Sequence, residues 1–228
     1  MSQQAMKGFG YFGKVPTRGD FIQSQLPEEF VSAWREWLQA VTAVSREQLA
    51  ENWLEIYLIS PIWHFSLAPQ VCGEPAVIGT LMPSVDQVGR HFYMTIAKPV
   101  QGDHLAFWED RQWSESSESK ILRLLEDDTD VVRWADGLKT VDWVENIEEC
   151  DSVQDLSSAS EQMILVANQS VTVSQLNRQL LKSRFQRPCV WWTQGSEHIP
   201  ACTIVSESLP MVSQFSAMLD GNWSQWGW

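Results

Sequence analysis

The chain has 228 residues, of which 44% are hydrophobic and 20% are charged, a composition typical of a folded protein with a sizeable core. Its formal net charge of −13 argues against nucleic acid as a partner, because the phosphates would be repelled. No apolar run reaches the roughly 18 residues of a membrane-spanning helix, and the first residues lack the basic start and apolar block of a signal peptide. We therefore expect a cytoplasmic protein with no membrane insertion.

The N-terminal part begins with a glycine-rich, aromatic stretch. Residues 8–15 predict a short strand, residues 16–19 predict a turn, and Asp20 can cap the element that follows. The glycines before Lys14 resemble a phosphate-binding loop only superficially, because Val-Pro follows where a helix should open. The sequence therefore predicts no nucleotide cofactor.

The next segment carries the clearest helical pattern. Residues 27–44 predict a helix, because Pro27 suits a first helical position, two glutamates follow it, and apolar residues then recur at helical spacing. A second helix is predicted over 45–53. Residues 56–59 favour either a strand or the end of that helix.

Three strands are predicted to follow. Residues 62–67 alternate in a way that indicates one dry face, and 76–82 is an apolar run. Residues 92–97 predict the third strand, closed by Lys98 and Pro99. Because the links between these strands are short and rich in turn residues, they favour an antiparallel meander.

The middle of the chain is acidic. Helical pieces are predicted over 104–113 and 118–125, and the whole region 104–160 is interpreted as helices and loops. Residues 109–155 contain 15 acidic and 5 basic residues, so this segment carries most of the net charge. Such a segment either steers a basic protein partner or is a solvated acidic face.

The C-terminal part, residues 174–219, predicts a helix, a hairpin and a helix. Its predicted elements are, in order, 174–185, 188–193, 201–205 and 209–219. Ser174 is the predicted cap of the first helix and Gly221 the stop of the last, while the polar stretch 151–160 predicts a loop and 161–170 is left unassigned. The order of strands, helices and strands favours an α+β fold with a mainly antiparallel sheet flanked by helices, as a single domain over 1–228.

Tryptophan and cysteine are the unusual residue types. Six of the 13 tryptophans lie in patterned segments and are predicted to be core: Trp34, Trp37, Trp53, Trp63, Trp191 and Trp192. The aromatic tail 220–228 either folds back onto its own domain or is a docking strand. The four cysteines show no metal-ligand spacing and are predicted to be reduced, although a bridge between Cys189 and Cys202 is conceivable if they lie on paired strands.

No coherent catalytic set emerges. Ser84 with Asp86 or His91 suggests a hydrolase, but the nucleophile-elbow pattern is absent. The four histidines are scattered, so neither a metal site nor a catalytic residue is expected. The hydrolase stays an alternative that Ala substitutions at these positions would test.

The strongest candidate site is a group of polar residues in two turn-rich segments, which form one patch if the first strand lies near the second turn. Its members are Lys14, Arg18, Asp20, Ser84, Asp86 and Arg90. The patch is either a partner-binding surface or an architectural brace between the two loops.

These same segments resemble the TagF (ImpM) family associated with type VI secretion. The matching runs are GYFGKVPTRGDFI over 10–22, LP at 26–27 with Phe30, Trp34, Trp37 and Leu38, Pro61 with Trp63 and Phe65, Gly79, and PSVDQVGRHF over 83–92. The specific motifs cover about 8–98, and the VWWT run at 190–193 and the segment 209–219 are less diagnostic. Tyr93 departs from the proline expected after Phe92, which affects the local turn.

The resemblance implies a cytoplasmic accessory protein of the bacterial type VI secretion system and a longin-like α/β fold with an antiparallel sheet. It implies a non-enzymatic, post-translational repressor that binds the forkhead-associated-domain scaffold of the secretion system. The family motif contains no catalytic residue to carry over. A constitutive structural module, docked through the acidic segment or the tail, is a further alternative.

Overall fold

A computed structural model describes residues 8–141, 143–144, 153–156, 163–168 and 170–228. Seven strands form one antiparallel sheet in the order β2-β1-β5-β4-β3-β8-β9. They are β1 (Gly10–Gly13), β2 (Ile22–Ser24), β3 (Trp63–Leu67), β4 (Ala76–Met82), β5 (Met94–Val100), β8 (Cys189–Gly195) and β9 (Pro200–Ser206). The predicted meander is β3-β4-β5, and the C-terminal hairpin pairs with β3, so both ends of the chain contribute to the same sheet.

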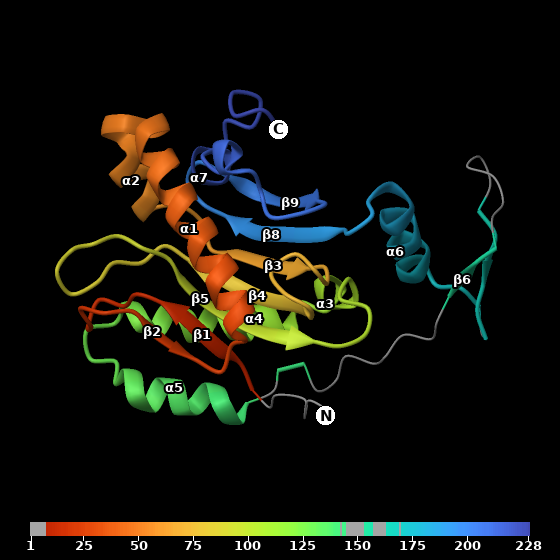
Figure 1. The fold of residues 1–228 in the computed structure, drawn as a ribbon, viewed down its shortest axis with the longest axis horizontal. Helices are drawn as coiled ribbons and strands as arrows, with labels where there is room; N and C mark the ends of the chain where they lie inside the picture. Colours follow the sequence, from red (N-terminus) through yellow and green to blue (C-terminus); the bar gives the residue numbers. More distant parts are fainter. Residues whose placement is uncertain (1–7, 142, 145–152, 157–162, 169) are drawn as a thin grey trace.

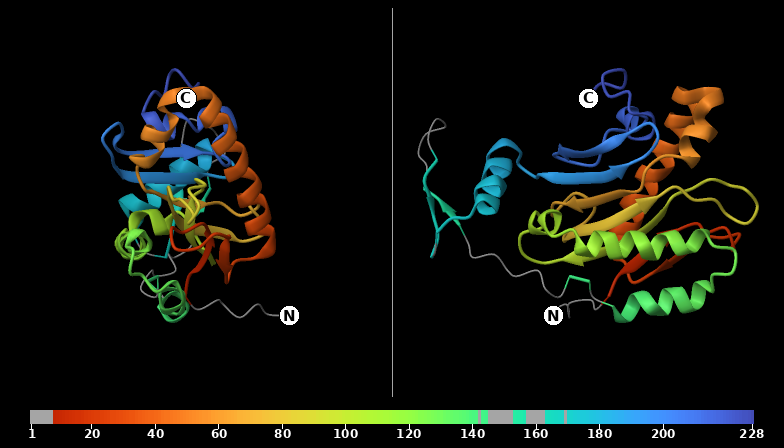
Figure 2. Two further views of the ribbon diagram at one scale, coloured as in Figure 1. Left: turned by 90° about the vertical axis from the view of Figure 1, so that its left-hand side faces the viewer. Right: turned by 180° about the vertical axis from the view of Figure 1, so that it is seen from behind.

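Helices cover both faces of this sheet (Figures 1 and 2). The helices, with the short 3-10 turns, are α1 (Glu28–Leu49), η1 (Ala50–Asn52), α2 (Trp53–Leu58), α3 (Ala106–Glu109), α4 (Gln112–Leu122), η2 (Arg123–Leu125), α5 (Val131–Thr140), α6 (Val173–Arg184), η3 (Val212–Gln214) and α7 (Ala217–Asp220). One face packs against α1, α2 and α7, and the other packs against α3, α4 and α5. The predicted α+β class is therefore confirmed.

The central strands are buried on both faces, where the sequence indicated one dry face for β3. Trp63, Phe65 and Leu67 point to the α1 side, whereas His64 and Ser66 point to the α4 side. All seven residues of β4 are likewise buried. Polar residues on such a strand must be paired internally: His64 contacts Thr80 and Glu118, and the Ser66 hydroxyl donates to the carbonyl of His104.

The six tryptophans predicted to be core are all buried, and five of them belong to the hydrophobic cluster on the α1 side of the sheet. The rings of Trp34 and Trp191 stack with centroids 6.0 Å apart, and Trp34 lies 4.7 Å from Phe65. Each indole that finds an acceptor also ties elements together, as when Trp34 Nε1 donates to Thr95 Oγ1 at 2.9 Å.

The helix α1 is longer than the sequence predicts. The prediction ended it at Val44 and began another at Ser45, but the helix runs to Leu49 and ends where Ala50 adopts a positive φ of 47°. Ser45 does not break it, because its buried hydroxyl donates to the Thr42 carbonyl and accepts from Trp53 Nε1 at 3.0 Å. Residues 56–59 are the end of helix α2 and its cap.

Two elements near the N-terminal sheet edge and the acidic segment were missed. The chain after Asp20 forms strand β2, which pairs with β1, so Asp20 caps nothing. Helix α5 lies inside the acidic segment, and its cap is Asp130, whose carboxylate accepts from the backbone N–H groups of Val132 and Arg133. Its apolar residues at helical spacing are the signal that the net charge obscured.

Strand β5 continues through Lys98 and Pro99 to Val100, although the sequence predicted that this pair would close it. The reason is local geometry: β1 pairs with β5 only as far as Ala97, so Pro99 lies where β5 has a neighbour on one side alone. A proline, which lacks a donor N–H, is tolerated at such a position.

Several C-terminal boundaries also differ. Helix α6 begins one residue earlier than predicted, because Thr172 rather than Ser174 is the cap and forms a reciprocal capping box with Gln175. The last predicted helix is instead the 3-10 turn η3 and the short α7. As predicted, Gly221 stops α7, and it does so in the left-handed conformation. A separate pair, β6 (Gln154–Asp155) and β7 (Leu165–Val166), lies where a loop and an unassigned stretch were expected.

The alternatives for the tail and the thiols are decided for the described residues. The tail folds back, since Trp228 Nε1 donates to the carbonyl of Gln214 at 2.9 Å and Gln214 Nε2 donates to the carbonyl of Gly227 at 2.6 Å. Cys189 and Cys202 are free thiols, and their strand register sets Cys202 opposite Thr193 instead. Cys150 and most of the predicted loop 151–160 lie outside the described residues.

Candidate functional site: two loops joined at a buried aspartate

The two motif-bearing loops lie next to each other because their strands are neighbours. The first loop, residues 14–21, leaves β1, and the second, residues 83–93, leads into β5, whose Met94 pairs with Gly13. Gly13 needs its glycine, since a Cβ there would lie 2.3 Å from the carbonyl oxygen of Tyr93. The close approach of these two backbones is what brings the loops together.

Asp86 is the centre of this contact. Its carboxylate is buried and receives Lys14 Nζ at 2.6 Å and Arg90 Nε at 2.7 Å, and it also accepts the backbone N–H groups of Val88 and Arg90. Burial disfavours the charged form, but these hydrogen bonds outweigh it and hold the pKa of Asp86 well below its usual range. Asp86 is therefore a permanently charged acceptor rather than a proton donor at neutral pH.

Ser84 and the backbone complete the junction. The Ser84 hydroxyl donates to the carbonyl of Lys14 at 2.8 Å, and Tyr57 Oη donates to the Ser84 carbonyl while accepting its N–H. Arg90 also donates to the Gly19 carbonyl. We call Lys14, Ser84, Asp86 and Arg90 the loop brace.

The structure thus brings together four of the six predicted site residues. The other two, Arg18 and Asp20, are exposed, and their side chains make no hydrogen bond or ion pair with any described residue. The backbone of Arg18 does participate, because its carbonyl accepts the N–H of Gln87 at 3.0 Å.

Arg18 and Asp20 line a groove of about 730 Å³ between the first loop, β2 and helix α5, which we call the α5 groove. Its walls combine charged and apolar residues. The apolar ones include Ile22 and Val132, and Val132 is 59% exposed. Sequence reasoning did not include α5 in the site, although a cap at Asp130 followed by apolar residues at helical spacing predicts such a helix.

Tyr57 is the other residue that the sequence did not reveal. It comes from α2, far from both loops in the chain, and only the folding of α2 against the sheet carries its hydroxyl to Ser84.

His91, proposed with Ser84 in the hydrolase alternative, instead packs edge-on against Trp53 and Tyr57. Burial lowers the pKa of His91, and Arg46 lowers it further.

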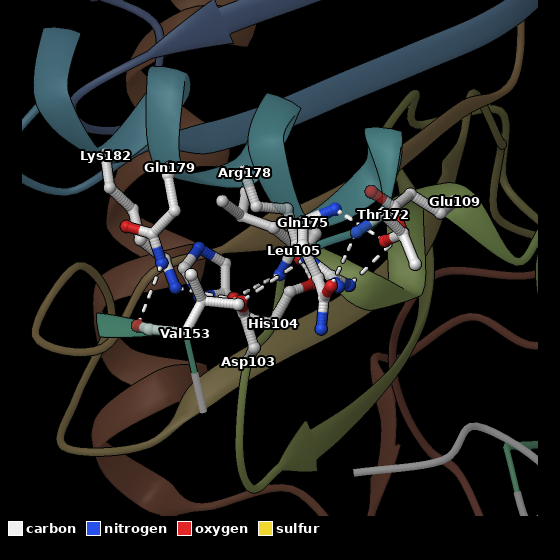
Figure 3. A network of polar contacts seen from close by, with 11 residues as sticks. Asp103, His104, Leu105, Glu109, Val153, Thr172, Gln175, Arg178, Gln179 and Lys182 are labelled. Carbon is white, nitrogen blue, oxygen red and sulfur yellow. Dashed lines mark hydrogen bonds and ion pairs between the residues drawn. The ribbon is translucent and has the colours of Figure 1, made fainter. Parts of the chain in front are cut away.

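A second polar network fixes α6 beside α3 (Figure 3). The Arg178 side chain is buried and contacts Glu109 Oε2 at 3.2 Å and Asp103 Oδ2 at 3.7 Å, while Lys182 Nζ lies 2.8 Å from Asp103 Oδ2. We call Asp103, Glu109, Arg178 and Lys182 the α6 clamp. It was not predicted, because its acids and bases lie about 70 residues apart in the sequence.

Comparisons with known proteins agree on the family. The family model described as the TagF N-terminal domain, type VI secretion system-associated, matches residues 10–141. The chain belongs to the TagF family. A crystal structure of PA0076 from Pseudomonas aeruginosa PAO1 is also similar, with 31% sequence identity, a TM-score of 0.78, and 94% of each chain covered. No curated protein matched the sequence.

The TagF family match includes the whole loop brace and helix α5, and it ends before α6, β8 and β9. The resemblance seen in the sequence over about 8–98 is therefore confirmed and extended to α5. Family membership makes this chain a type VI secretion-associated accessory protein. Within the described residues, no three His, Cys, Asp or Glu side chains group as a metal site would require, and none of the described helices is both long and apolar enough to cross a bilayer.

Proposed function

We propose that this TagF-family chain is a non-enzymatic, cytoplasmic negative regulator of the type VI secretion system that acts after translation by binding another protein. The observation that carries the proposal is the state of its most distinctive residues. The polar groups of the loop brace are engaged with one another, whereas the charged side chains beside them, Arg18 and Asp20, are exposed and form no ion pair with the described part of the chain.

The brace is suited to hold a surface rather than to perform a reaction. Ser84 is 4% exposed and its hydroxyl is committed to a backbone carbonyl, so it lacks the adjacent base that would activate a nucleophile. Asp86 is held charged by two cations, which makes it a poor general acid. Two loops fixed in this way present the α5 groove with little freedom, and a rigid surface loses little entropy on binding.

The proposed partner is the forkhead-associated-domain scaffold that promotes assembly of the secretion system. Support comes from the family resemblance, and the exposed charges beside the groove provide a means of recognition. Exposed charge contacts tune association rate and specificity more than they tune affinity, so binding is expected to weaken as ionic strength rises.

The decisive experiment combines binding and secretion. Purified chain is tested for capture of the scaffold at several salt concentrations, and secretion is measured after deletion of its gene. We expect capture that weakens with salt and increased secretion in the deletion strain. The charge-reversal pair Arg18→Glu with Asp20→Lys should impair both effects, whereas Glu47→Lys with Glu51→Lys, at exposed positions on the far end of α1 and in η1, should impair neither. Absence of capture together with unchanged secretion would refute the proposal.

The hydrolase alternative is tested separately with Ser84→Ala. Loss of repression by a variant that keeps its melting temperature and its scaffold binding would favour an enzyme. The structural-module alternative predicts capture that persists whether or not secretion is active. A regulator predicts that capture is lost when secretion is switched on.

A further inference from the structure

The sheet has an open edge at β2 that the proposed function does not yet use. β2 pairs with β1 on one side, and no described strand pairs with its other side. An unpaired strand edge exposes a row of backbone donors and acceptors, which is a template for an added strand. Figure 2 shows this edge lying between helix α1 on one side and helix α5 on the other.

A groove follows the edge on each face of the sheet. The α5 groove lies on one face, where Ile22 points into it and Tyr11 packs against Trp134. On the opposite face, a groove of about 540 Å³ is lined by Gln23 and residues of α1, and Arg35 Nη2 donates to Gln23 Oε1 there. We call it the α1 groove. Because side chains of a strand alternate between faces, a strand added at β2 places them in the two grooves in turn.

The two grooves differ in chemistry. The α5 groove has an apolar wall that includes Ile22, Val131 and the exposed Val132. In the α1 groove, Glu28 and Glu36 are exposed and have no ion-pair partner among the described residues. The cation of the α1 groove, Arg35, donates to Gln23 and stacks over the ring of Phe12, and its single positive charge offsets only one of these two carboxylates. The charged residues that line the α1 groove therefore leave it with a net negative charge.

We propose that the β2 edge binds an extended segment of a partner protein as an additional strand. Apolar side chains of that segment enter the α5 groove, and Lys or Arg side chains meet Glu28 and Glu36 in the α1 groove. The backbone pairing supplies affinity and the alternating pockets supply specificity, as in other cases of strand addition. This inference rests on the proposed function for the existence of a protein partner, and it adds where that partner binds and what its chemistry is.

The probe is a short peptide of alternating lysine and valine, added to the full chain. Among Ile22, Gln23 and Ser24, we expect slower amide hydrogen exchange, measured by NMR, at the residues whose N–H groups point away from β1. Control peptides separate the contribution of charge from that of backbone pairing. One has glutamate in place of lysine. The others are methylated on alternate backbone nitrogens, one peptide for each of the two alternating sets. The glutamate peptide and at least one methylated peptide should bind about tenfold more weakly, because the first is repelled and the second cannot complete the backbone ladder.

Variants locate the contact. Glu28→Lys with Glu36→Lys should weaken binding of the lysine–valine peptide about tenfold. Glu47→Lys with Glu51→Lys makes the same change in net charge away from the edge and should leave binding within about twofold. Because Glu28 lies in the first turn of α1, melting temperatures are measured for both pairs, and Glu36→Lys alone replaces the double variant if that one is destabilised.

Each outcome is decisive. Slower amide exchange at residues outside β2 overturns strand addition. So does slower exchange at β2 that persists with both methylated peptides. Self-association of the wild type that is lost in Glu28→Lys with Glu36→Lys assigns the edge to a second copy of this chain and also overturns the inference. Scaffold capture that is unaffected by the Glu28 and Glu36 changes, with no probe binding, refutes the inference but leaves the proposed function standing. Absence of scaffold capture by the wild type, together with unchanged secretion in the deletion strain, refutes the proposed function.

Discussion

The loop brace and the α6 clamp are both ion-pair networks that join segments distant in the sequence, but they differ in what surrounds them. Asp86 is buried, receives two cations, and also accepts two backbone N–H groups. In the α6 clamp, the buried cation Arg178 is shared between two partly exposed acids, Asp103 and Glu109. One network surrounds a carboxylate with donors, and the other surrounds a guanidinium with acids.

This difference shifts the pKa values of the carboxyl groups in opposite directions. Donors around Asp86 hold its pKa low, whereas partial burial raises the pKa of Glu109, and Asp103 nearby adds to the rise while Arg178 opposes it. The charged state is thus strongly stabilised in the brace and weakly supported in the clamp. A short ion-pair distance alone does not reveal how much a pair stabilises the fold.

The largest expected effect comes from Asp86→Asn. The amide keeps the shape but leaves the buried Lys14 ammonium without its anion, so we expect the free energy of unfolding to fall by about 3–5 kcal/mol. Urea denaturation followed by tryptophan fluorescence measures this loss. The matched control, Asp20→Asn at an exposed position that pairs with none of the described residues, should change it by no more than about 0.5 kcal/mol. Equal losses in the two variants would contradict the role of the brace.

The contribution of Asp86 should depend on pH in a defined direction. Because its pKa is lowered on folding, its stabilisation is present above the unfolded value of about 3.9 and is lost as pH falls toward the folded value. The stability difference between wild type and Asp86→Asn should therefore be constant between about pH 5 and 7 and shrink below about pH 4. A difference that instead grows with acidity would refute the depressed pKa.

Removing the cation of the α6 clamp should have a smaller and more local effect. Arg178→Met leaves Glu109 partly buried without its partner, which should cost about 1–3 kcal/mol. Because Arg178 is the only fully buried residue of α6, the loss should appear as faster amide exchange and protease cleavage in α6, while the signal of the buried tryptophans is unchanged. Arg184→Met, at an exposed position of the same helix, is the control. If Arg178→Met unfolded globally at the same urea midpoint as Asp86→Asn, that result would contradict a local effect.

The smallest expected effect is that of Glu109→Gln. A raised carboxyl pKa means that stability is fully present below the unfolded value and declines as pH rises through the folded value, so the charge of Glu109 works against folding at pH 7. Neutralising it should change the free energy of unfolding by no more than about 0.5 kcal/mol, and in the stabilising direction. Asp103→Asn, which weakens the contacts to Lys182 and Arg178, should instead destabilise the fold. Comparing their melting curves at pH 7 tests whether the two acids differ.

The contrast between the networks also explains which site residues the sequence revealed. The brace is encoded in two compact motifs, each with glycine, proline, a cation and a carboxylate, so Lys14, Ser84, Asp86 and Arg90 could be grouped before the fold was known. The α6 clamp combines an acidic segment with a distant helix. Net charge indicated only an acidic surface, because composition does not record which acids are paired internally.

Secondary structure followed the same division. The strands of the meander and the hairpin were predicted closely, because alternating and apolar patterns set them locally. The extension of α1 through Ser45, the continuation of β5 through Pro99 and the existence of β2 were not predicted. In each case the tertiary surroundings decided the outcome. Trp53 satisfies the Ser45 hydroxyl inside α1, and pairing with β1 forms the three-residue strand β2. Pro99 is tolerated in β5 because β1 pairs with β5 only as far as Ala97.

The sequence by itself determined the α+β class, the tryptophan core, the family resemblance and the residues of the brace, because short-range patterns of polarity and turn chemistry carry that information. Only the tertiary structure decided that Tyr57 reaches Ser84, that Arg18 and Asp20 are exposed beside a groove, and that β2 is the last strand of the sheet formed by the described residues. Those features depend on which elements become neighbours in space, and long-range neighbours leave no local signature in the chain.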